Sequence, residues 1–326
     1  MRSDEMKQLH ISCFPGDEEY AEYFFSRRFD PSHAYFAFEG ETLAAAAYAR
    51  IIELEIGERV IEVPFITGVA TAPRFRMRGF ARNVLSRAED ALREEGYPFM
   101  MLHPFNHDFY KKLGWVTINE LGGFYPKPCG SPTKRAIALN ADMWADTYRV
   151  YSEWAKRTPA HIFRSAEAQR EHIEMFLKYC GTGYLIIDNS SPIAYVLIEE
   201  GEVVEAMSAT DDAYDGIAEL AGKRIPLFTS GGREYSMAKL LDLKALIRLL
   251  PMRGVTLNAR FGYSGKTYEL KVDDGTLSAL TEASGDAYEA PPAEMLRTAL
   301  GHGKEYPFSP IGSLFPEYVP NVFEKY

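Results

Sequence analysis

Apolar side chains recur every three to four residues through the first 28 positions, which predicts one or two amphipathic helices. The residues that carry this spacing are Met6, Leu9, His10, Phe14, Tyr20, Tyr23, Phe24 and Phe25. Apolar and β-branched runs then predict strands over residues 35–39, 43–53 and 60–71. The dipeptides Gly40-Glu41 and Gly57-Glu58 separate these runs and predict hairpin turns.

Residues 65–85, FITGVATAPRFRMRGFARNVL, predict a strand, an arginine-rich turn and a helix in direct succession. The strand ends at Pro73, and the helix begins near Gly79 and ends at Gly96. The unpaired N–H groups and the dipole of a helix start attract anions, and glycine lets a phosphate approach the backbone. The turn also holds Arg74, Arg76, Arg78 and Arg82. We therefore expect an anion site here, the alternative being an ordinary connection with a solvated basic face.

The rest of the first third predicts short elements that return to the same sheet. A buried strand over 99–102 precedes a helix over 108–113, which Gly114 ends, and a strand over 115–118. The Pro-, Gly- and Ser-rich run 127–135 is expected to be a linker.

A similar order of elements recurs after this linker and predicts a second domain. The expected elements are helices over 143–158, 166–178 and 212–221 and strands over 184–188, 193–199, 203–209 and 225–228. Gly231-Gly232 marks the next boundary. The last part predicts helices over 239–250 and 292–300 around strands over 255–260, 267–272 and 275–279, followed by an aromatic-rich tail.

Composition narrows the function classes. A chain of 326 residues with 46% hydrophobic residues is expected to form two or three globular domains. A net charge of −10 argues against nucleic-acid binding and weakly favours a cationic substrate. Cys13, Cys129 and Cys180 are far apart and in no C-x-x-C pattern, so we expect a reducing, cytoplasmic compartment without disulfides or a zinc site. We find no signal peptide or membrane-spanning run.

The spacing Arg76-x-x-Gly79-x-Ala81 between a strand and a helix resembles the acetyl-CoA signature of GNAT N-acetyltransferases. The predicted order of elements over residues 1–128 also resembles the GNAT (acyl-CoA N-acyltransferase) fold. A GNAT domain usually opens with a strand, whereas here the first predicted element is a helix. Either the start is truncated or the sheet lacks that edge strand.

Three segments resemble the Eis (enhanced intracellular survival) family of acetyltransferases. They are VATAPRFRMRGFAR (69–82), FYKKLGW (109–115) and MAKLLDL (237–243). In the second segment Leu113 stands where the family prefers an aromatic residue. The resemblance implies an α+β architecture of three domains: a catalytic GNAT domain (1–128), a degenerate GNAT-like domain without cofactor (129–234) and a sterol-carrier-like α+β domain (235–326). It also implies a homo-oligomer, a hexamer in that family.

The family resemblance also implies roles for individual residues. The backbone of Val69, Ala70 and Thr71 would pair with the pantetheine arm. Phe105 and Asn106 would touch the arm from the other side. Tyr110 would be the general acid, and the carboxylate of Tyr326 the general base. The pyrophosphate would be held by Met77, Arg78, Gly79, Phe80, Ala81 and Arg82.

Other residues offer alternatives to some of these roles. Glu62 could be the base through a water, although its place in an alternating strand also fits an outward residue. His103 and His107 are separated by Pro104, which makes a metal site improbable, and no metal is expected. The acidic run 17–19 beside Tyr20 and Phe24 could line an amine pocket, but an amphipathic helix with a solvated face explains it more simply.

The resulting hypothesis is an acetyl-CoA-dependent N-acetyltransferase that acts on primary amines of a cationic small molecule, aminoglycoside- or polyamine-like. Because we expect no cysteine near the site, transfer is expected to be direct, in a ternary complex. A protein or peptide lysine is the alternative acceptor. A third reading is a binding protein for an apolar ligand, with a GNAT domain that only senses acetyl-CoA.

Overall fold

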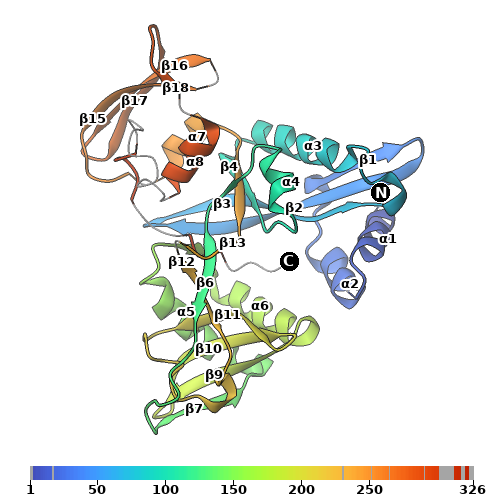
Figure 1. Cartoon of the computed structure of the whole chain (residues 1–326), viewed down its shortest axis with the longest axis vertical. Helices are drawn as coiled ribbons and strands as arrows, with labels where there is room; N and C mark the ends of the chain where they lie inside the picture. The colour runs from blue at the N-terminus through green and yellow to red at the C-terminus, as the bar shows by residue number, and fades with distance from the viewer. Residues whose placement is uncertain are drawn as a thin grey trace. The chain divides into compact units, whose positions relative to one another are not determined.

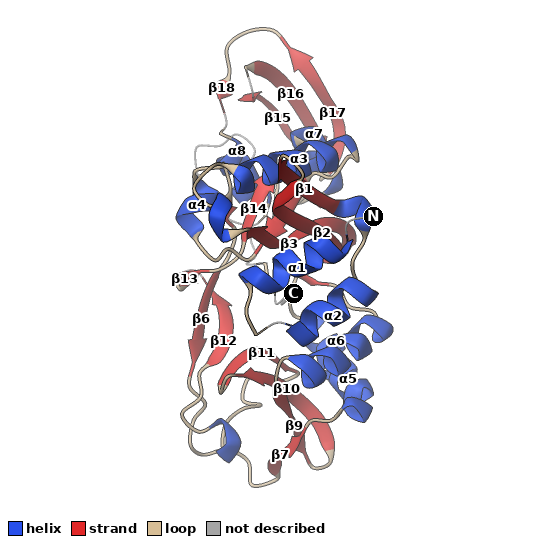
Figure 2. Cartoon of the chain, turned by 90° about the vertical axis from the view of Figure 1, so that its right-hand side faces the viewer, coloured by secondary structure: helices blue, strands red, loops and turns tan. Residues whose placement is uncertain are grey.

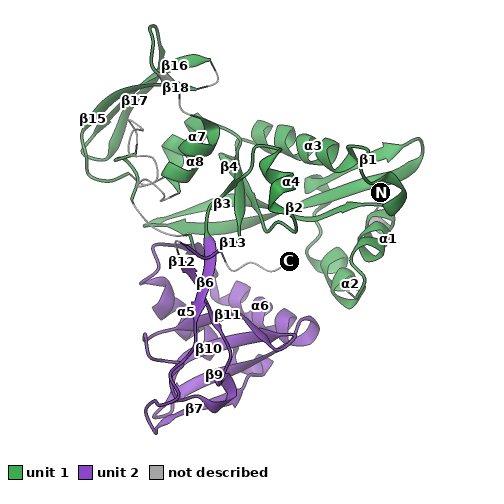
Figure 3. Ribbon diagram, in the orientation of Figure 1, with its two compact units in different colours: residues 1–119, 234–320, 326 green, residues 120–233, 321–325 purple. Residues whose placement is uncertain are grey.

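The computed structural model describes residues 3–16, 18–229, 231–250, 252–263, 265–289, 291–300, 312–316 and 320–322. Two compact units contain them, coloured separately in Figure 3. The first unit lies within Met1–Asn119 and Glu234–Pro320, and the second comprises Glu120–Arg233 with residues 321–322. The three predicted segments therefore do not map one to one onto compact units, because the first and the last share one unit.

The predicted elements of the first 118 residues are present. Helices α1 (Ser3–Cys13) and α2 (Glu18–Arg27) and a short 3₁₀ turn, η1 (Pro31–His33), come first. They precede the hairpin-linked strands β1 (Ala34–Glu39), β2 (Thr42–Ile56) and β3 (Arg59–Thr71). A second 3₁₀ turn, η2 (Pro73–Phe75), follows, and then α3 (Phe80–Glu94), β4 (Phe99–Leu102), α4 (His107–Lys111) and β5 (Val116–Thr117). Figures 1 and 2 show α1 and α2 on one face of this sheet and α3 and α4 on the other.

A strand from the last third of the chain completes the sheet of the first unit. The strand order is β1-β2-β3-β4-β14-β5, in which β14 (Met237–Leu240) runs antiparallel to both β4 and β5. The sequence predicted a helix over residues 239–250, and this prediction is wrong at its start. Residues up to Leu240 are extended, and α7 (Leu243–Leu249) begins after Asp242, whose side chain accepts the Ala245 N–H at 3.0 Å. A short apolar run reads equally well as strand or helix, and pairing with β4 decides it.

The two faces of this sheet carry different cores. On the α3 face, small alanines of β2 let Val84, Leu85, Ala88 and Leu92 pack close to the strands. On the α1 face, Tyr48 contacts the rings of Phe24, Phe25 and Phe29 at centroid distances of 5.5, 5.3 and 5.6 Å. The apolar spacing of α2 therefore reflects the packing of this helix against Tyr48.

The first unit also contains a smaller sheet formed by the last part of the chain. Its strand order is β17-β16-β15-β18, with β18 parallel to β15. The strands are β15 (Leu257–Tyr263), β16 (Lys266–Asp273), β17 (Thr276–Ala283) and β18 (Tyr288–Glu289), and α8 (Pro292–Ala299) follows them. This order of elements agrees with the strands and the final helix expected from the sequence.

The second unit begins with β6 (Glu120–Phe124), which pairs antiparallel with β12 (Ile225–Thr229). Its main sheet has the order β11-β10-β9-β7. These strands are β7 (Lys134–Ala138), β9 (Thr182–Asp188), β10 (Ser191–Glu199) and β11 (Glu202–Ser208). Helices α5 (Trp144–Ala155) and α6 (Ala166–Tyr179) and the short strand β8 (Ala160–Ile162) lie between β7 and β9 in the chain, and the chain leaves the unit within β13 (Arg233–Glu234).

Two predictions for the second unit are wrong. The expected helix over 212–221 is a series of turns ending in a 3₁₀ helix, Ala218–Leu220, because Gly216 has a positive φ of 77°. The expected linker 127–135 packs within the unit and includes the start of β7. Its glycine allows this, since a Cβ on Gly130 would lie 2.1 Å from the carbonyl oxygen of Asp215.

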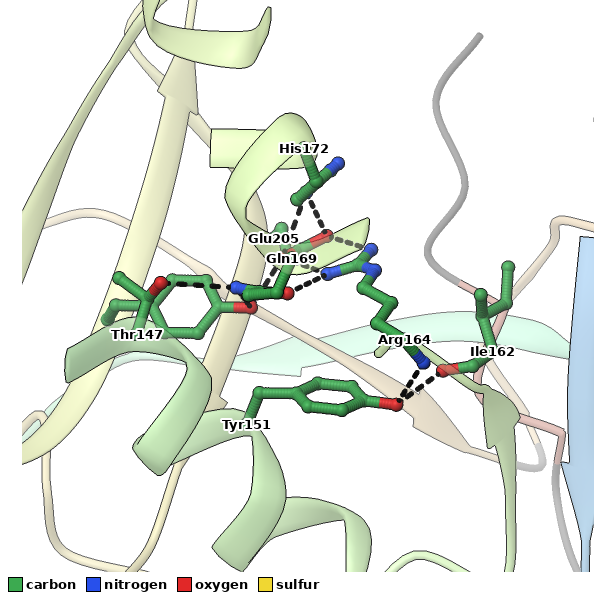
Figure 4. A network of polar contacts seen from close by, with 8 residues as sticks. Thr147, Tyr151, Ile162, Arg164, Gln169, His172 and Glu205 are labelled. Atoms are coloured by element: carbon green, nitrogen blue, oxygen red, sulfur yellow. Dashed lines mark hydrogen bonds and ion pairs between the residues drawn. The ribbon is translucent and has the colours of Figure 1, made fainter. Parts of the chain in front are cut away.

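A buried polar network lies inside the second unit (Figure 4). The Glu205 carboxylate on β11 accepts from both Nη atoms of Arg164, at 2.9 and 2.8 Å, and from the Tyr195 hydroxyl at 2.7 Å. His172 Nε2 lies 3.1 Å from the same carboxylate. Burial alone would raise the pKa of Glu205, but Arg164 and His172 hold it well below its usual range. The carboxylate is therefore ionised and fully paired.

Candidate functional site

Strand β3 has a bulge at Gly68 and Val69. In the register of β2 and β3, Tyr48 pairs with Thr67 and Ala46 with Ala70, so two residues of β3 face Ala47 alone. Gly68 has a φ of 58°, and a Cβ there would lie 2.3 Å from the Tyr48 ring. Only glycine fits this position, because any side chain would strain the backbone and clash with the tyrosine.

Strands β3 and β4 separate beside this bulge. They run parallel and pair at Phe65 and Met101, and β4 then ends at Leu102 while β3 continues to Thr71. Ala70 and Thr71 pair with β2 on one side only, because β2 and β4 are the neighbours of β3 in the sheet. No described strand therefore pairs with residues 69–71 on the β4 side, although the Thr71 carbonyl oxygen already accepts from the side chains of Arg76 and Cys13.

The predicted anion turn connects β3 to α3. It contains the 3₁₀ turn η2 (Pro73–Phe75), Met77 with a φ of 61°, and Gly79 with a φ of 85° at the N-cap of α3. No side chain caps the helix, and a Cβ on Gly79 would meet nothing within 4 Å. The first N–H groups of α3 have no partner within the helix, so a phosphate oxygen could approach them.

Two arginines of this turn, Arg76 and Arg78, contact neighbours on the first unit. Arg76 Nε donates to the carbonyl oxygen of Thr71 at 3.2 Å. Arg78 forms an ion pair with Glu39 at the end of β1, and its guanidinium lies over the rings of Phe75 and Phe80. Of the other predicted contacts here, Met77 is fully exposed, Ala81 is half-buried and Arg82 is exposed.

The residues predicted on the far side of the opening differ in their surroundings. Phe105 is fully exposed, with a relative accessibility of 103%. The Asn106 side chain caps α4 by accepting the Phe109 N–H at 3.1 Å, so its amide oxygen already has a structural role.

Tyr110 lies on α4 in the core of the α3 face. Its side chain is 8% exposed and contacts the rings of Phe109 and Trp115 at 5.0 and 5.7 Å. Burial raises the pKa of Tyr110 to about 12, so the hydroxyl keeps its proton at neutral pH. Leu102 at the end of β4 belongs to the same core cluster as Tyr110.

The comparisons with known proteins agree with this architecture. Residues 2–118 match the family model described as an acetyltransferase (GNAT) domain. This segment is a GNAT acetyltransferase domain. It carries the bulged strand, the opening beside β4, the arginine turn and Tyr110.

Solved structures resemble the whole chain. A conserved protein of unknown function from Enterococcus faecalis V583, named a probable N-acyltransferase, is 16% identical with a TM-score of 0.78, over 100% of this chain and 97% of its own. A GCN5-related N-acetyltransferase from Kribbella flavida is 17% identical with a TM-score of 0.72, over 100% and 96%. Eis1 from Mycobacterium abscessus is 12% identical with a TM-score of 0.68, over 100% and 97%. At such identities the likeness shows a shared fold, and no curated protein matches the chain.

Two residues of α1 approach the bulge of the GNAT domain from the face opposite Tyr110. His10 is 7% exposed, and its ring nitrogens have no hydrogen-bond partner among the described residues. Its Nδ1 would lie 3.3 Å from a Cβ on Gly68, and burial lowers the pKa of His10 to about 4. Cys13 Sγ donates to the carbonyl oxygen of Thr71 at 3.5 Å.

The expectation that no cysteine lies near the site is therefore wrong. Cys13 contacts the last residue of β3, where the acyl donor is predicted to pair. The helical spacing of His10 and Cys13 places both on one face of α1, but the sequence contains no signal for the strand on which that face packs.

The structure describes one of the two predicted bases, Glu62. Tyr326 lies outside the described residues. Glu62 is exposed, pairs in register with Glu53 and lies six residues before Gly68 on β3. Six residues of extended strand span about 20 Å, so Glu62 is far from the bulge along β3.

The acidic and aromatic residues of α2 do not form a common surface. Tyr20 and Phe24 are 7% and 3% exposed in the core, while Glu18 and Glu19 are exposed. This is the amphipathic helix that the simpler explanation expected.

Among the described residues, no group of three or more His, Cys, Asp or Glu side chains is arranged to hold a metal ion. No helix in this part of the chain is long and apolar enough to cross a membrane.

Proposed function

We propose that the protein transfers an acetyl group from acetyl-CoA to a primary amine of a cationic, aminoglycoside- or polyamine-like molecule. The observation that carries this proposal is the open edge of β3 at the Gly68 bulge, followed directly by the arginine turn at the start of α3. A strand edge suits the amide-bearing pantetheine arm, and a helix start with arginines suits a pyrophosphate. Acetyl-CoA would supply the activated acetyl thioester.

Each residue of the site would then have one task. The backbone of Val69, Ala70 and Thr71 would hold the arm, and residues 77–82 the pyrophosphate. A backbone N–H at the bulge near Val69 would stabilise the oxyanion that forms when the amine attacks. Tyr110 would supply the proton that the leaving thiolate needs, and the Tyr326 carboxylate would take the proton that the attacking amine loses.

The pKa values limit how Tyr110 can act. A thiol has a pKa near 8.5, so full proton transfer from a tyrosine whose pKa is about 12 is uphill by about 5 kcal/mol. That cost is too large to ignore, but small beside the barriers that enzymes lower. A hydrogen bond from the hydroxyl to the sulfur in the transition state avoids most of it.

We also propose that the second unit is a degenerate GNAT copy and that the last part of the chain is a sterol-carrier-like domain. The sheet β11-β10-β9-β7 with α5 and α6 supports the first assignment, and the sheet β17-β16-β15-β18 with α7 and α8 supports the second.

A thiol-release assay with a panel of acceptors tests the proposed activity. We expect CoA release from acetyl-CoA to accelerate with aminoglycosides or polyamines, because their primary amines can lose a proton and attack. Lysine peptides serve as the alternative acceptor. If turnover is fastest on the peptides, a protein or peptide lysine replaces the small-molecule amine as the proposed acceptor. If CoA binds but no amine is acetylated, the proposal of an acetyltransferase activity is contradicted.

The proposed terminal base is tested by deleting Tyr326 and, separately, by appending a short glycine-serine extension. Either change moves the α-carboxylate, so we expect kcat to fall at least tenfold, as for loss of a general base. The affinity for CoA, measured by calorimetry, should stay the same. Full turnover in both variants would eliminate the terminal carboxylate, and a parallel Glu62→Gln variant would then show whether the strand glutamate acts instead.

A further inference from the structure

The ion pair between Arg78 and Glu39 occupies a guanidinium that the proposed pyrophosphate site needs. Arg78 directly precedes Gly79, the N-cap of α3, and Glu39 is the last residue of β1. Both side chains are 48% exposed, so the pair lies at the surface where an anionic ligand would arrive. The rings of Phe75 and Phe80, at 5.6 and 5.5 Å from the guanidinium, hold it in place.

A carboxylate and a phosphate bind a guanidinium in the same way, through paired N–H donors. Glu39 Oε1 accepts from Arg78 Nη2, a donor that a phosphate oxygen of the ligand would also use. When the ligand binds, either Arg78 exchanges one anion for the other or a phosphate and Glu39 share it at close range. Both outcomes cost binding free energy, because the first breaks an ion pair and the second brings like charges together.

We infer that Glu39 is an affinity-determining residue of the proposed CoA site. Its carboxylate competes with the ligand's phosphates for Arg78 and keeps the site's affinity for CoA low. This inference rests on the proposed function. An enzyme that must release CoA after every turnover gains from such a competitor, because a weaker product complex dissociates faster.

The size of the effect follows from Coulomb's law. Two unit charges about 7 Å apart across a guanidinium in water change a dissociation constant about threefold, and partial exclusion of water increases this. The effect is also screened by salt, because both groups are half-exposed.

Calorimetric titration of CoA into the wild-type protein, Glu39→Gln and Glu41→Gln tests the inference. Glu41 is exposed in the adjoining turn, so its substitution changes the net charge equally without touching the ion pair. We expect Glu39→Gln to lower the Kd for CoA about three- to fivefold at low salt, with a smaller gain at high salt. Glu41→Gln should leave the Kd unchanged.

A double-mutant cycle with Arg78→Gln tests whether Glu39 changes the affinity for CoA through Arg78. If Glu39 acts by occupying Arg78, removing the carboxylate should change the Kd little once the guanidinium is gone. Weaker CoA binding in Glu39→Gln would show that Glu39 orients Arg78 for the ligand and would overturn the inference. An equal gain in Glu41→Gln would also overturn it, since net charge would then explain the effect. Absence of CoA binding in the wild-type protein would instead contradict the proposed function.

Discussion

Tyr110→Phe is expected to lower kcat about 100-fold or more while leaving the fold and the affinity for CoA nearly unchanged. The substitution removes the hydroxyl proposed to donate to the leaving thiolate, and loss of a general acid costs about 10²–10⁴ in rate. It keeps the ring, whose contacts with Phe109 and Trp115 lie in the core. The measurements are steady-state kcat, calorimetric Kd for CoA and the thermal unfolding midpoint.

Tyr97→Phe is the matched control for this experiment. Tyr97 is a half-buried tyrosine packed against the same core cluster, and burial raises its pKa as it does for Tyr110. Its loss should not change kcat, because the proposed mechanism gives it no task. If kcat of Tyr110→Phe stays within threefold of the wild-type value, Tyr110 is a packing residue and the acid lies elsewhere.

The pH dependence of kcat provides a second test of Tyr110 as the general acid. Because burial raises the pKa of Tyr110 to about 12, its hydroxyl remains protonated throughout the usual assay range. Deprotonation of Tyr110 should therefore not reduce kcat at any pH lower than about 11. An alkaline decline centred near pH 9 that persists in Tyr110→Phe would identify a different donor.

The strand–turn–helix around Gly79 could be predicted from the sequence because every signal in it is local. Pro73 ends a strand, Gly79 adopts a positive φ, and the apolar spacing of the following residues requires a helix. Tyr110 is different, since a lone tyrosine near a helix carries no chemical signal. Its proposed role comes from the resemblance of residues 109–115 to a family, and burial in the structure accounts only for its raised pKa.

The parts that sequence reasoning missed depend on contacts between distant residues. Met237 to Leu240 become a strand because β4 and β5 pair with them, which no local pattern reveals. Gly130 and Gly216 look like linker and helix residues, yet their backbones pack against each other, with a Cβ on Gly216 predicted 2.5 Å from the Gly130 nitrogen. Cys13 could be assigned to a helix face, but its contact with Thr71 depends on how that helix docks on β3.

Glu205→Gln should destabilise the second unit by about 3–5 kcal/mol. The substitution neutralises the carboxylate that pairs with Arg164, a side chain 5% exposed, and an unpaired buried charge costs about this much. The Tyr195 hydroxyl loses the same acceptor. His172 loses it too (Figure 4). Part of the loss should be recovered in Arg164→Met combined with Glu205→Gln, because the two residues interact directly.

Tryptophan fluorescence can follow the second unit by itself. Of the three tryptophans, Trp144 and Trp154 lie on α5, and Trp115 lies in the first unit. In a Trp115→Phe background, urea unfolding reports α5 and gives the stability difference from the shift of the midpoint. Glu202→Gln, at an exposed position of the same strand, is the control and should change the stability by less than about 0.5 kcal/mol.

Acid titration gives an independent test of the same carboxylate. The folded state holds the pKa of Glu205 below its ordinary value of 4.5, so the unfolded chain takes up the proton more readily. The contribution of Glu205 is therefore complete above about pH 4.5 and is lost as the pH falls toward the depressed value. Glu205→Gln should lose less stability than the wild-type protein across that window. Parallel acid curves, or a urea midpoint unchanged by Glu205→Gln, would show that the buried network contributes nothing to folding.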